Sequence, residues 1–131
     1  IIIGMGGNIG TQSSTIIVRG MATGRITIGN ELTIILKELK TGLILGGLYG
    51  VMLGVFAWFR FIDTNPLIGI VVGLSICSSM IIATGVGTFT PLALRKLDID
   101  PAVATGPFVT TSIDILGVLL YFLIAGLLLQ V

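Results

Sequence analysis

A single carboxylate, Asp114, stands in the apolar run TSIDILGVLLYF, and no basic residue occurs between Lys96 and the C-terminus. Thr110 and Thr111 lie one helical turn before it, so both hydroxyls would share a helix face with the carboxylate. Carboxylate and hydroxyl oxygens are ligands that hard cations prefer. Asp114, Thr110 and Thr111 are therefore candidate metal ligands.

Backbone oxygens add to this cluster. Gly106 and Pro107 interrupt the helix that the sequence predicts over residues 101–129. Proline has no N–H, so the carbonyl of Val103, four residues earlier, loses its helical partner and is free to face water or a cation. We expect Val103, Gly106 and Pro107 to line a passage that leads to Asp114.

A second polar set lies in GGNIGTQSSTIIVRG. Its members share one helix face: Asn8, Thr11, Gln12, Thr15 and Arg19. At about 1.5 Å per residue, Asn8 and Asp114 each lie roughly 20 Å from the basic end of their helix, near the middle of a hydrocarbon layer about 30 Å thick. We expect the first four of these residues to line the same passage as Asp114. Taken alone, they fit helix-to-helix hydrogen bonds at least as well.

The carboxylate needs a partner at that depth. A charged Asp near the centre of a membrane helix costs at least about 2.5 to 3.5 kcal/mol, so it normally faces water and is paired. No Lys, Arg or His lies at this depth, which favours a mobile cation; the alternative is an Asp114 that is protonated or hydrogen-bonded to Asn8 or Gln12. Oxygen ligands without His or a thiolate cluster favour Mg²⁺, although spacing does not separate it from Ca²⁺, Mn²⁺, Na⁺ or H⁺.

The elements that must position these residues are membrane helices. Of 131 residues, 54% are hydrophobic and 10% charged, with a mean hydropathy of +1.13, which is too apolar for a soluble domain. The net charge of +1 indicates no nucleic-acid partner. The predicted fold class is an all-α membrane protein, a polytopic transmembrane helix bundle with spans over residues 1–22, 41–59, 66–94 and 101–129. The pattern GRITIGNELTIILKELK predicts an amphipathic interfacial helix between the first two spans.

The small residues predict how the spans pack against one another, and the loop charges predict which side of the membrane each connection faces. Glycine recurs every fourth residue from Gly42 to Gly54, and Gly69, Gly73 and Cys77 continue this spacing, which predicts close helix packing. Basic residues gather at the first and third connections, and the second has only Arg60. The positive-inside rule therefore puts the C-terminus on the outer side.

With these residues in view, the chain resembles the transmembrane domain of the MgtE family of magnesium channels and transporters. The resemblance covers nearly all 131 residues and rests on GGNIGTQSSTIIVRGMATG at 6–24, LKELKTG at 36–42 and DPAVATGPFVTTSIDILG at 100–117. It implies a multi-pass protein of the plasma (inner) membrane and a homodimer of five-span subunits with a pore along the dimer axis. It also implies Mg²⁺ as the transported ion, bound in the pore at Asp114 beside backbone carbonyls near Thr110.

The resemblance also bears on the domain organisation and on secondary sites. Residues 1–131 would form the transmembrane cation-conducting domain, and we expect the family's first span and cytoplasmic regulatory domains to be absent from them. Glu38 and Asp100 are candidate secondary cation sites. Lys37 and Lys40 beside Glu38 favour an ordinary interfacial charge, and Asp100 also suits a helix N-cap before Pro101.

Three functions remain open. The first is a Mg²⁺-selective channel that conducts the hydrated ion past Asp114. The second is a Na⁺- or H⁺-coupled divalent cation transporter or exchanger on the same scaffold. The third is a membrane assembly module whose polar residues only bind helices together. An enzyme is not expected, because the chain has no His and no nucleophile beside a plausible base.

Overall fold

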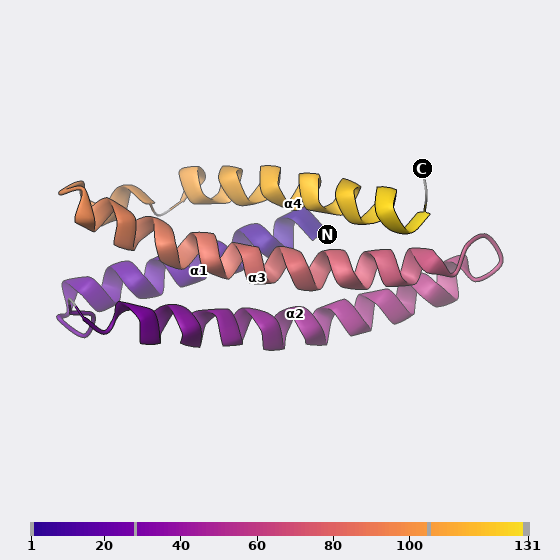
Figure 1. Cartoon of the computed structure of the whole chain (residues 1–131), viewed down its shortest axis with the longest axis horizontal. Coiled ribbons are helices and arrows are strands. Elements are labelled where there is room, and N and C mark those ends of the chain that lie inside the picture. Colours follow the sequence, from indigo (N-terminus) through magenta and orange to yellow (C-terminus); the bar gives the residue numbers. More distant parts are fainter. Residues whose placement is uncertain (1, 28, 105, 130–131) are drawn as a thin grey trace.

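The computed structural model describes residues 2–27, 29–104 and 106–129, which form a bundle of helices (Figure 1). In chain order these are α1 (Ile2–Ala22), α2 (Glu31–Phe61), α3 (Leu67–Lys96), the short 3₁₀ helix η1 (Pro101–Ala104) and α4 (Pro107–Leu129). The described residues contain no strand, so the predicted all-helical class is confirmed. Residues 1, 28, 105, 130 and 131 lie outside this description. Residues 1 and 105 belong to predicted spans, and residue 28 belongs to the predicted interfacial helix.

Three of the described helices, α2, α3 and α4, are long and apolar enough to cross a membrane. We predicted four spans. α1 has 21 residues, enough in length, but its face of amide and hydroxyl side chains and Arg19 makes it too polar to be counted with the others. The spanning role of α1 therefore stays a prediction, whereas the multi-pass character of the chain is supported by the other three helices.

The expected interfacial helix is not a separate element. Residues 31–40, which carry the amphipathic pattern, and the predicted span over 41–59 form the single helix α2, which continues without a break from Glu31 to Phe61. No proline lies in this stretch, and the first glycine, Gly42, is buried against α3, so nothing at the junction ends the helix. The change in hydropathy near Thr41, from the amphipathic residues 31–40 to the apolar residues that follow, therefore does not mark a helix boundary.

α2 and α3 run side by side along most of their length (Figure 1), and their backbones touch. A Cβ atom built on Gly50 would lie 2.7 Å from the carbonyl oxygen of Gly73, and one on Gly54 would lie 2.9 Å from that of Gly69. Real Cβ atoms essentially never approach other atoms so closely. The prediction of close helix packing through glycine is therefore confirmed for this pair.

α3 lies between α2 and α4 in Figure 1 and is the most buried helix of the three membrane-spanning candidates. Against it pack Val109 and Ile113 of α4, which form a buried cluster with Ala83 of α3. α1 crosses α3 closely, because an added Cβ on Gly87 would meet the carbonyl oxygen of Gly10. α3 thus holds α1 and α4 in place.

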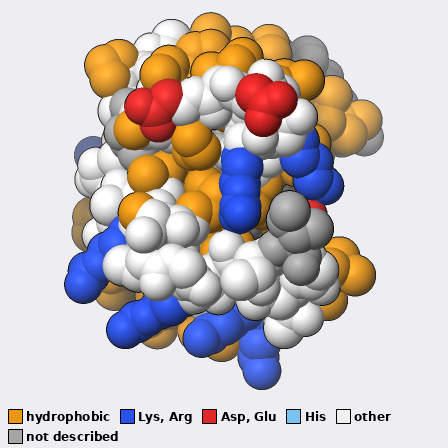
Figure 2. Space-filling model, turned by 90° about the vertical axis from the view of Figure 1, so that its left-hand side faces the viewer, with side chains coloured by type: hydrophobic (Ala, Val, Ile, Leu, Met, Phe, Trp, Pro, Cys, Tyr) orange, Lys and Arg blue, Asp and Glu red, His pale blue; other side chains and the backbone are white. Residues whose placement is uncertain are grey.

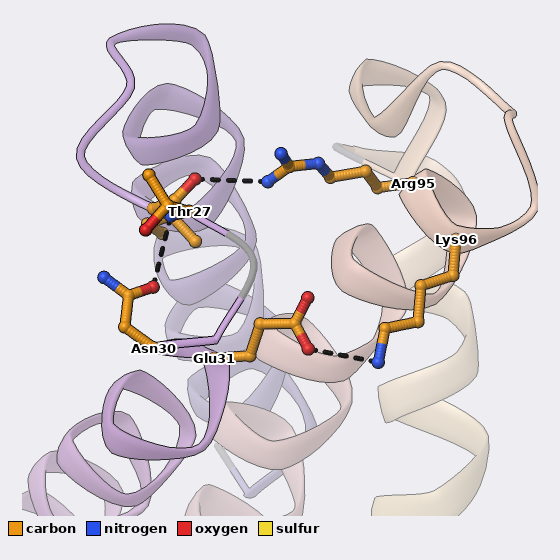
Figure 3. A network of polar contacts seen from close by, with 6 residues as sticks. Thr27, Asn30, Glu31, Arg95 and Lys96 are labelled. Carbon is orange, nitrogen blue, oxygen red and sulfur yellow. Dashed lines mark hydrogen bonds and ion pairs between the residues drawn. The ribbon is translucent and has the colours of Figure 1, made fainter.

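A polar network joins the α1–α2 loop to the end of α3 (Figure 3). An Nη atom of Arg95 donates to the carbonyl oxygen of Ile26 at 3.1 Å, and Lys96 Nζ lies 3.0 Å from Glu31 Oε2. The Ile26 side chain is buried with Ile17 of α1 and Leu92 of α3 in a second cluster. The network therefore fixes the loop against the ends of α1 and α3.

Positive charge gathers at this same end of the bundle. Figure 2 views it directly and shows several Lys and Arg side chains around the rim, with fewer acidic ones. The last turn of α1 supplies Arg19, and that of α3 supplies Arg95 and Lys96, whereas the last turn of α2 at the opposite end has Arg60. The two ends of the described bundle therefore differ in charge, as the sequence predicted.

Candidate cation site between α1 and α4

The two predicted polar sets meet. Thr11 of α1 and Thr110 of α4 bring their hydroxyl oxygens within 3.1 Å of each other. Each hydroxyl also lies within hydrogen-bonding distance of the carbonyl one turn earlier, Thr11 with Gly7 at 2.9 Å and Thr110 with Gly106 at 3.1 Å. The two hydroxyl protons can make only two of these three hydrogen bonds at a time. Each hydroxyl oxygen therefore keeps at least one lone pair that can accept a hydrogen bond from water or coordinate a cation.

Asp114 lies one turn along α4 from this pair and packs against α1. Its Oδ1 atom is 3.3 Å from the position that a Cβ would take on Gly7, so the absence of a side chain on Gly7 makes room for the carboxylate. Oδ1 is buried and has no hydrogen-bond partner among the described residues. The alternative in which Asn8 or Gln12 hydrogen-bonds to Oδ1 is thus not found.

Among the described residues, no positive side chain pairs with Asp114 either. The ion pair found in these parts of the chain is that of Lys96 with Glu31 at the charged end of the bundle. A buried anionic oxygen without a donor or a cation is costly, and such groups are normally satisfied by water, an ion or a proton. The unpartnered Oδ1 of Asp114 therefore leaves room for any of these three, and Asp114 stays a predicted cation ligand.

The approach to this site differs from the prediction. We expected one kinked helix over residues 101–129, with Pro107 inside it and the Val103 carbonyl freed by the proline. Instead η1 ends at Ala104, Gly106 takes a left-handed backbone conformation with φ of 91°, and Pro107 is the first residue of α4. Proline suits a first helical position, where its missing N–H has no helical acceptor in any case.

The remaining predicted lining residues are mostly exposed. Thr111 on α4 and three residues of α1 present their side chains outward from the single chain: Asn8, Gln12 and Thr15. Thr15 donates its hydroxyl proton to the Thr11 carbonyl at 2.8 Å, whereas no described hydrogen bond satisfies the amide side chains of the two others. Polar groups thus continue from the Thr11–Thr110 contact onto an open face formed by α1 and α4.

The two candidate secondary sites have structural partners. Asp100 accepts a hydrogen bond at Oδ1 from the backbone N–H of Ala102 at 2.9 Å, which makes it the N-cap of η1 as predicted. Glu38 of α2 accepts one at Oε2 from the Ser13 hydroxyl of α1 at 2.9 Å. Both carboxylates keep oxygen lone pairs, so their role as secondary cation sites stays a prediction.

The described residues do not form a cage of charged metal ligands. No group of three or more His, Cys, Asp or Glu side chains gathers anywhere among the described residues. Mg²⁺ often keeps several waters and binds through one or two carboxylates, so a single Asp with neutral oxygens beside it fits a hydrated ion better than a dehydrated one. The donor set of Asp114, Thr110 and Thr11 is of this kind.

Two contributors were missed by reasoning from sequence. Gly7 admits Asp114, and the pair of glycines directly before Asn8 was a signal for a close helix approach at that level. Ser13 is 3% exposed and links α1 to Glu38, although it lies between predicted lining residues.

Comparisons with known proteins show the family of this chain. The family described as MgtE, divalent cation transporter, matches residues 1–124. The chain is 37% identical over 126 residues to the magnesium transporter MgtE of Bacillus subtilis, covering 95% of this chain and 27% of the relative. It is 38% identical over 131 residues to the magnesium transporter MgtE of Thermus thermophilus, covering 99% of this chain and 28% of the relative.

A third relative is the magnesium transporter MgtE of Enterococcus faecalis. It is 38% identical over 129 residues, which cover 97% of this chain and 28% of the relative. The chain thus spans just over a quarter of the length of the curated relatives it matches. These relatives are transporters and not enzymes. Because the family matches most of the sequence, the chain belongs to the MgtE family of divalent cation transporters.

Proposed function

We propose that this chain forms the ion-conducting part of a magnesium channel, in which hydrated Mg²⁺ passes Asp114 on its way across the membrane. The observation that carries the proposal is the buried Oδ1 of Asp114, which lacks a hydrogen-bond partner among the described residues and lies beside the Thr11–Thr110 contact. The names of the relatives, magnesium transporters, support Mg²⁺ as the ion.

Asp114 would raise the local concentration of cations without holding them tightly. Conduction requires binding that is favourable enough for entry and weak enough for release. One carboxylate and several neutral oxygens meet this requirement for Mg²⁺, because the ion dehydrates reluctantly and can keep its own waters, which would donate hydrogen bonds to these oxygens. A closed cage of carboxylates would instead retain the ion.

A homodimer would complete the passage. The amide side chains of Asn8 and Gln12 are exposed on the single chain, at a level where lipid offers no hydrogen-bond partners. A second copy facing the α1–α4 side would cover these groups, enclose water between the copies and bring a second Asp114 to the same passage. This supports a pore on a two-fold axis, with α1 as a further span.

The charge difference between the ends of the bundle supports an orientation. Under the positive-inside rule, the end with Arg19, Arg95 and Lys96 faces the cytoplasm, and the C-terminus lies on the outer side of the plasma membrane. Asp114 would then be reached from the cytoplasm through the segment around Gly106. Glu38 and Asp100 would lie nearer the cytoplasmic end.

The test is Mg²⁺ flux into liposomes that contain the purified chain and a fluorescent Mg²⁺ indicator. Asp114→Asn keeps the shape of the side chain and removes its charge, so flux should fall to the level of empty liposomes while assembly is retained. Asp63→Asn is the matched control, because Asp63 is an exposed residue between α2 and α3 and its change should leave flux unaltered. Unaltered flux in Asp114→Asn would refute the proposal.

Reversal potentials in a planar bilayer separate the channel from the coupled transporter. A channel gives a potential set by the Mg²⁺ gradient alone. A shift of this potential with the Na⁺ or H⁺ gradient would favour the exchanger, with Asp114 as the shared ligand. The third function, a module for helix assembly alone, predicts no flux in either experiment.

A further inference from the structure

Polar contacts hold α1 from two opposite sides. The Thr11 hydroxyl lies 3.1 Å from that of Thr110 on α4, and the Ser13 hydroxyl donates to Glu38 Oε2 on α2 at 2.9 Å. Residues two positions apart in an α-helix are turned by about 200° around its axis, so these two side chains leave α1 in nearly opposite directions. The exposed amide side chain of Gln12 points between them.

The side of α1 that faces α3 is smooth at this level. A Cβ on Gly6 would lie 2.9 Å from Ser79 Oγ, and one on Gly10 would lie 3.0 Å from the Ala83 carbonyl oxygen. Glycine brings the two helices close but has no side chain that could interlock with the partner. Ile17, one turn beyond Ser13, packs in an apolar cluster. The rotation of α1 about its axis at the level of Gln12 therefore depends on the two polar contacts.

Glu38 is turned toward α1 and not toward the headgroups. Its neighbours Lys37 and Lys40 are exposed, whereas Glu38 is half-buried and its partner Ser13 is 3% exposed. Neither lysine forms an ion pair with Glu38 among the described residues. A hydrogen bond to a charged acceptor is about twice as strong as one between neutral groups. Glu38 thus offers α1 a strong acceptor on the side opposite to α4.

We propose that Glu38 is a positioning residue of the ion passage. Through Ser13 it fixes the rotation of α1, so that the amide side chains of this helix face the passage. The carboxylate acts as a hydrogen-bond acceptor and not as a cation ligand. The effect on the passage rests on the proposed function, whereas the rotation of α1 is a property of the bundle and requires no transport.

Loss of this bond would release α1 on one side. Without an acceptor at position 38, the Ser13 hydroxyl is buried without a partner, which is costly. α1 can lower this cost by turning until the hydroxyl reaches water or another acceptor. A helix that turns more widely holds Thr11 beside Thr110 for less of the time and brings Gln12, on the neighbouring side, closer to α4 more often.

The first experiment measures this rotation by disulfide cross-linking. In a Cys77→Ser background, Thr110→Cys is combined with either Thr11→Cys or Gln12→Cys, and mass spectrometry follows the rate of disulfide formation within the chain. The pair at positions 11 and 110 should cross-link faster, because the hydroxyl oxygens at these positions are 3.1 Å apart. Ser13→Ala should lower the ratio of the two rates several-fold.

Variants of the acceptor and a matched control complete this experiment. Glu38→Ala should lower the ratio as Ser13→Ala does, and Glu38→Gln should preserve more of it, because glutamine keeps an acceptor oxygen. Ile17→Val removes one methylene from the packing of α1 and leaves the hydrogen bond intact, so the ratio should not change. A general loss of stability alters both cross-linking rates alike and leaves their ratio unaffected.

The second experiment connects the rotation to transport through Mg²⁺ flux per folded chain in liposomes. Ser13→Ala and Glu38→Ala should each lower flux several-fold. The double variant should lose no more than either single one, because each change removes the same bond. Glu38→Gln should retain more flux than Glu38→Ala, and Ile17→Val should conduct as wild type does.

Each experiment can overturn the proposal. An unchanged cross-linking ratio in Ser13→Ala would show that the bond does not fix α1. Equal losses of flux in Glu38→Gln and Glu38→Ala would assign Glu38 to cation binding through its charge, and additive losses in the double variant would separate the two residues. Unaltered flux in Asp114→Asn together with a lowered cross-linking ratio in Ser13→Ala would refute the channel alone and support the rotation.

Discussion

The contact between Gly7 and Asp114 gives a sharp prediction through the change Gly7→Ala. The added Cβ would lie 3.1 Å from Thr110 Cγ2 and 3.3 Å from Asp114 Oδ1, whereas ordinary contacts begin at 3.4 Å, so α4 or the carboxylate must move by a few tenths of an ångström. Overpacking costs about 1–3 kcal/mol, and replacing a helical glycine with alanine gains about 1 kcal/mol. We expect Gly7→Ala to lower the free energy of unfolding by about 0–2 kcal/mol.

Gly4→Ala is the control, one helical turn away on α1. Nothing lies within 4 Å of a Cβ at Gly4, so this change should raise the free energy of unfolding by up to about 1 kcal/mol. The two variants should therefore differ by about 1–3 kcal/mol. The measurement is unfolding in mixed detergent micelles followed by circular dichroism, with Mg²⁺ flux into liposomes as the second assay.

Flux separates a displaced carboxylate from a mere loss of stability. In Gly7→Ala, Asp114 is pushed from its position beside α1, and flux per folded protein should fall, whereas Gly4→Ala should conduct as wild type does. If the two variants had equal stability and equal flux, the close approach of α1 to Asp114 would be wrong. The argument that this contact places the carboxylate in the passage would then fail as well.

Three further predictions follow from single contacts. Gly87→Ala should reduce the yield of folded protein more than Gly7→Ala does, because its Cβ meets the carbonyl oxygen of Gly10, which no side-chain rotation can move; a normal yield would contradict the α1–α3 crossing. Ser13→Ala should cost about 1.5–3 kcal/mol in the same unfolding assay, the range for a hydrogen bond to a charged group such as Glu38, and no loss would exclude that bond. Lys96→Ala should cost at most about 1 kcal/mol, because its side chain is 69% exposed, and a larger loss would show that the ion pair is shielded from water.

The sequence predicted the helices and the meeting of two polar faces. Long apolar runs require helices in a membrane, and counting residues along each run predicted that Asn8 and Asp114 lie at one level. The 3.1 Å contact of Thr11 with Thr110, each about one turn from those residues, shows that the two polar faces meet. Glycines at every fourth position predicted the α2–α3 packing for a similar reason, since few other arrangements use that pattern. These predictions succeed because each local pattern is compatible with only one kind of structure.

Other features depend on information that local patterns lack. Gly106 followed by Pro107 is compatible with a kink inside one helix and with a break between two, and the left-handed conformation of Gly106 decides for the break. The hydropathy change near Thr41 resembled a boundary between elements, yet the backbone of α2 continues through it. The position of Ser13 under α2 depended on the crossing of two helices, which the α1 sequence alone does not specify.

The glycine seam of α2 and α3 determines how this pair can vary in evolution. Where the two backbones touch, no side chain can change its rotamer to make room for a larger residue. A substitution at such a glycine should therefore push the two helices apart. Neutral variation should therefore concentrate on the lipid-facing positions of both helices, and paired compensating changes across the seam should be rare. Insertions or deletions of single residues in either helix would shift every later glycine out of register and should be excluded altogether.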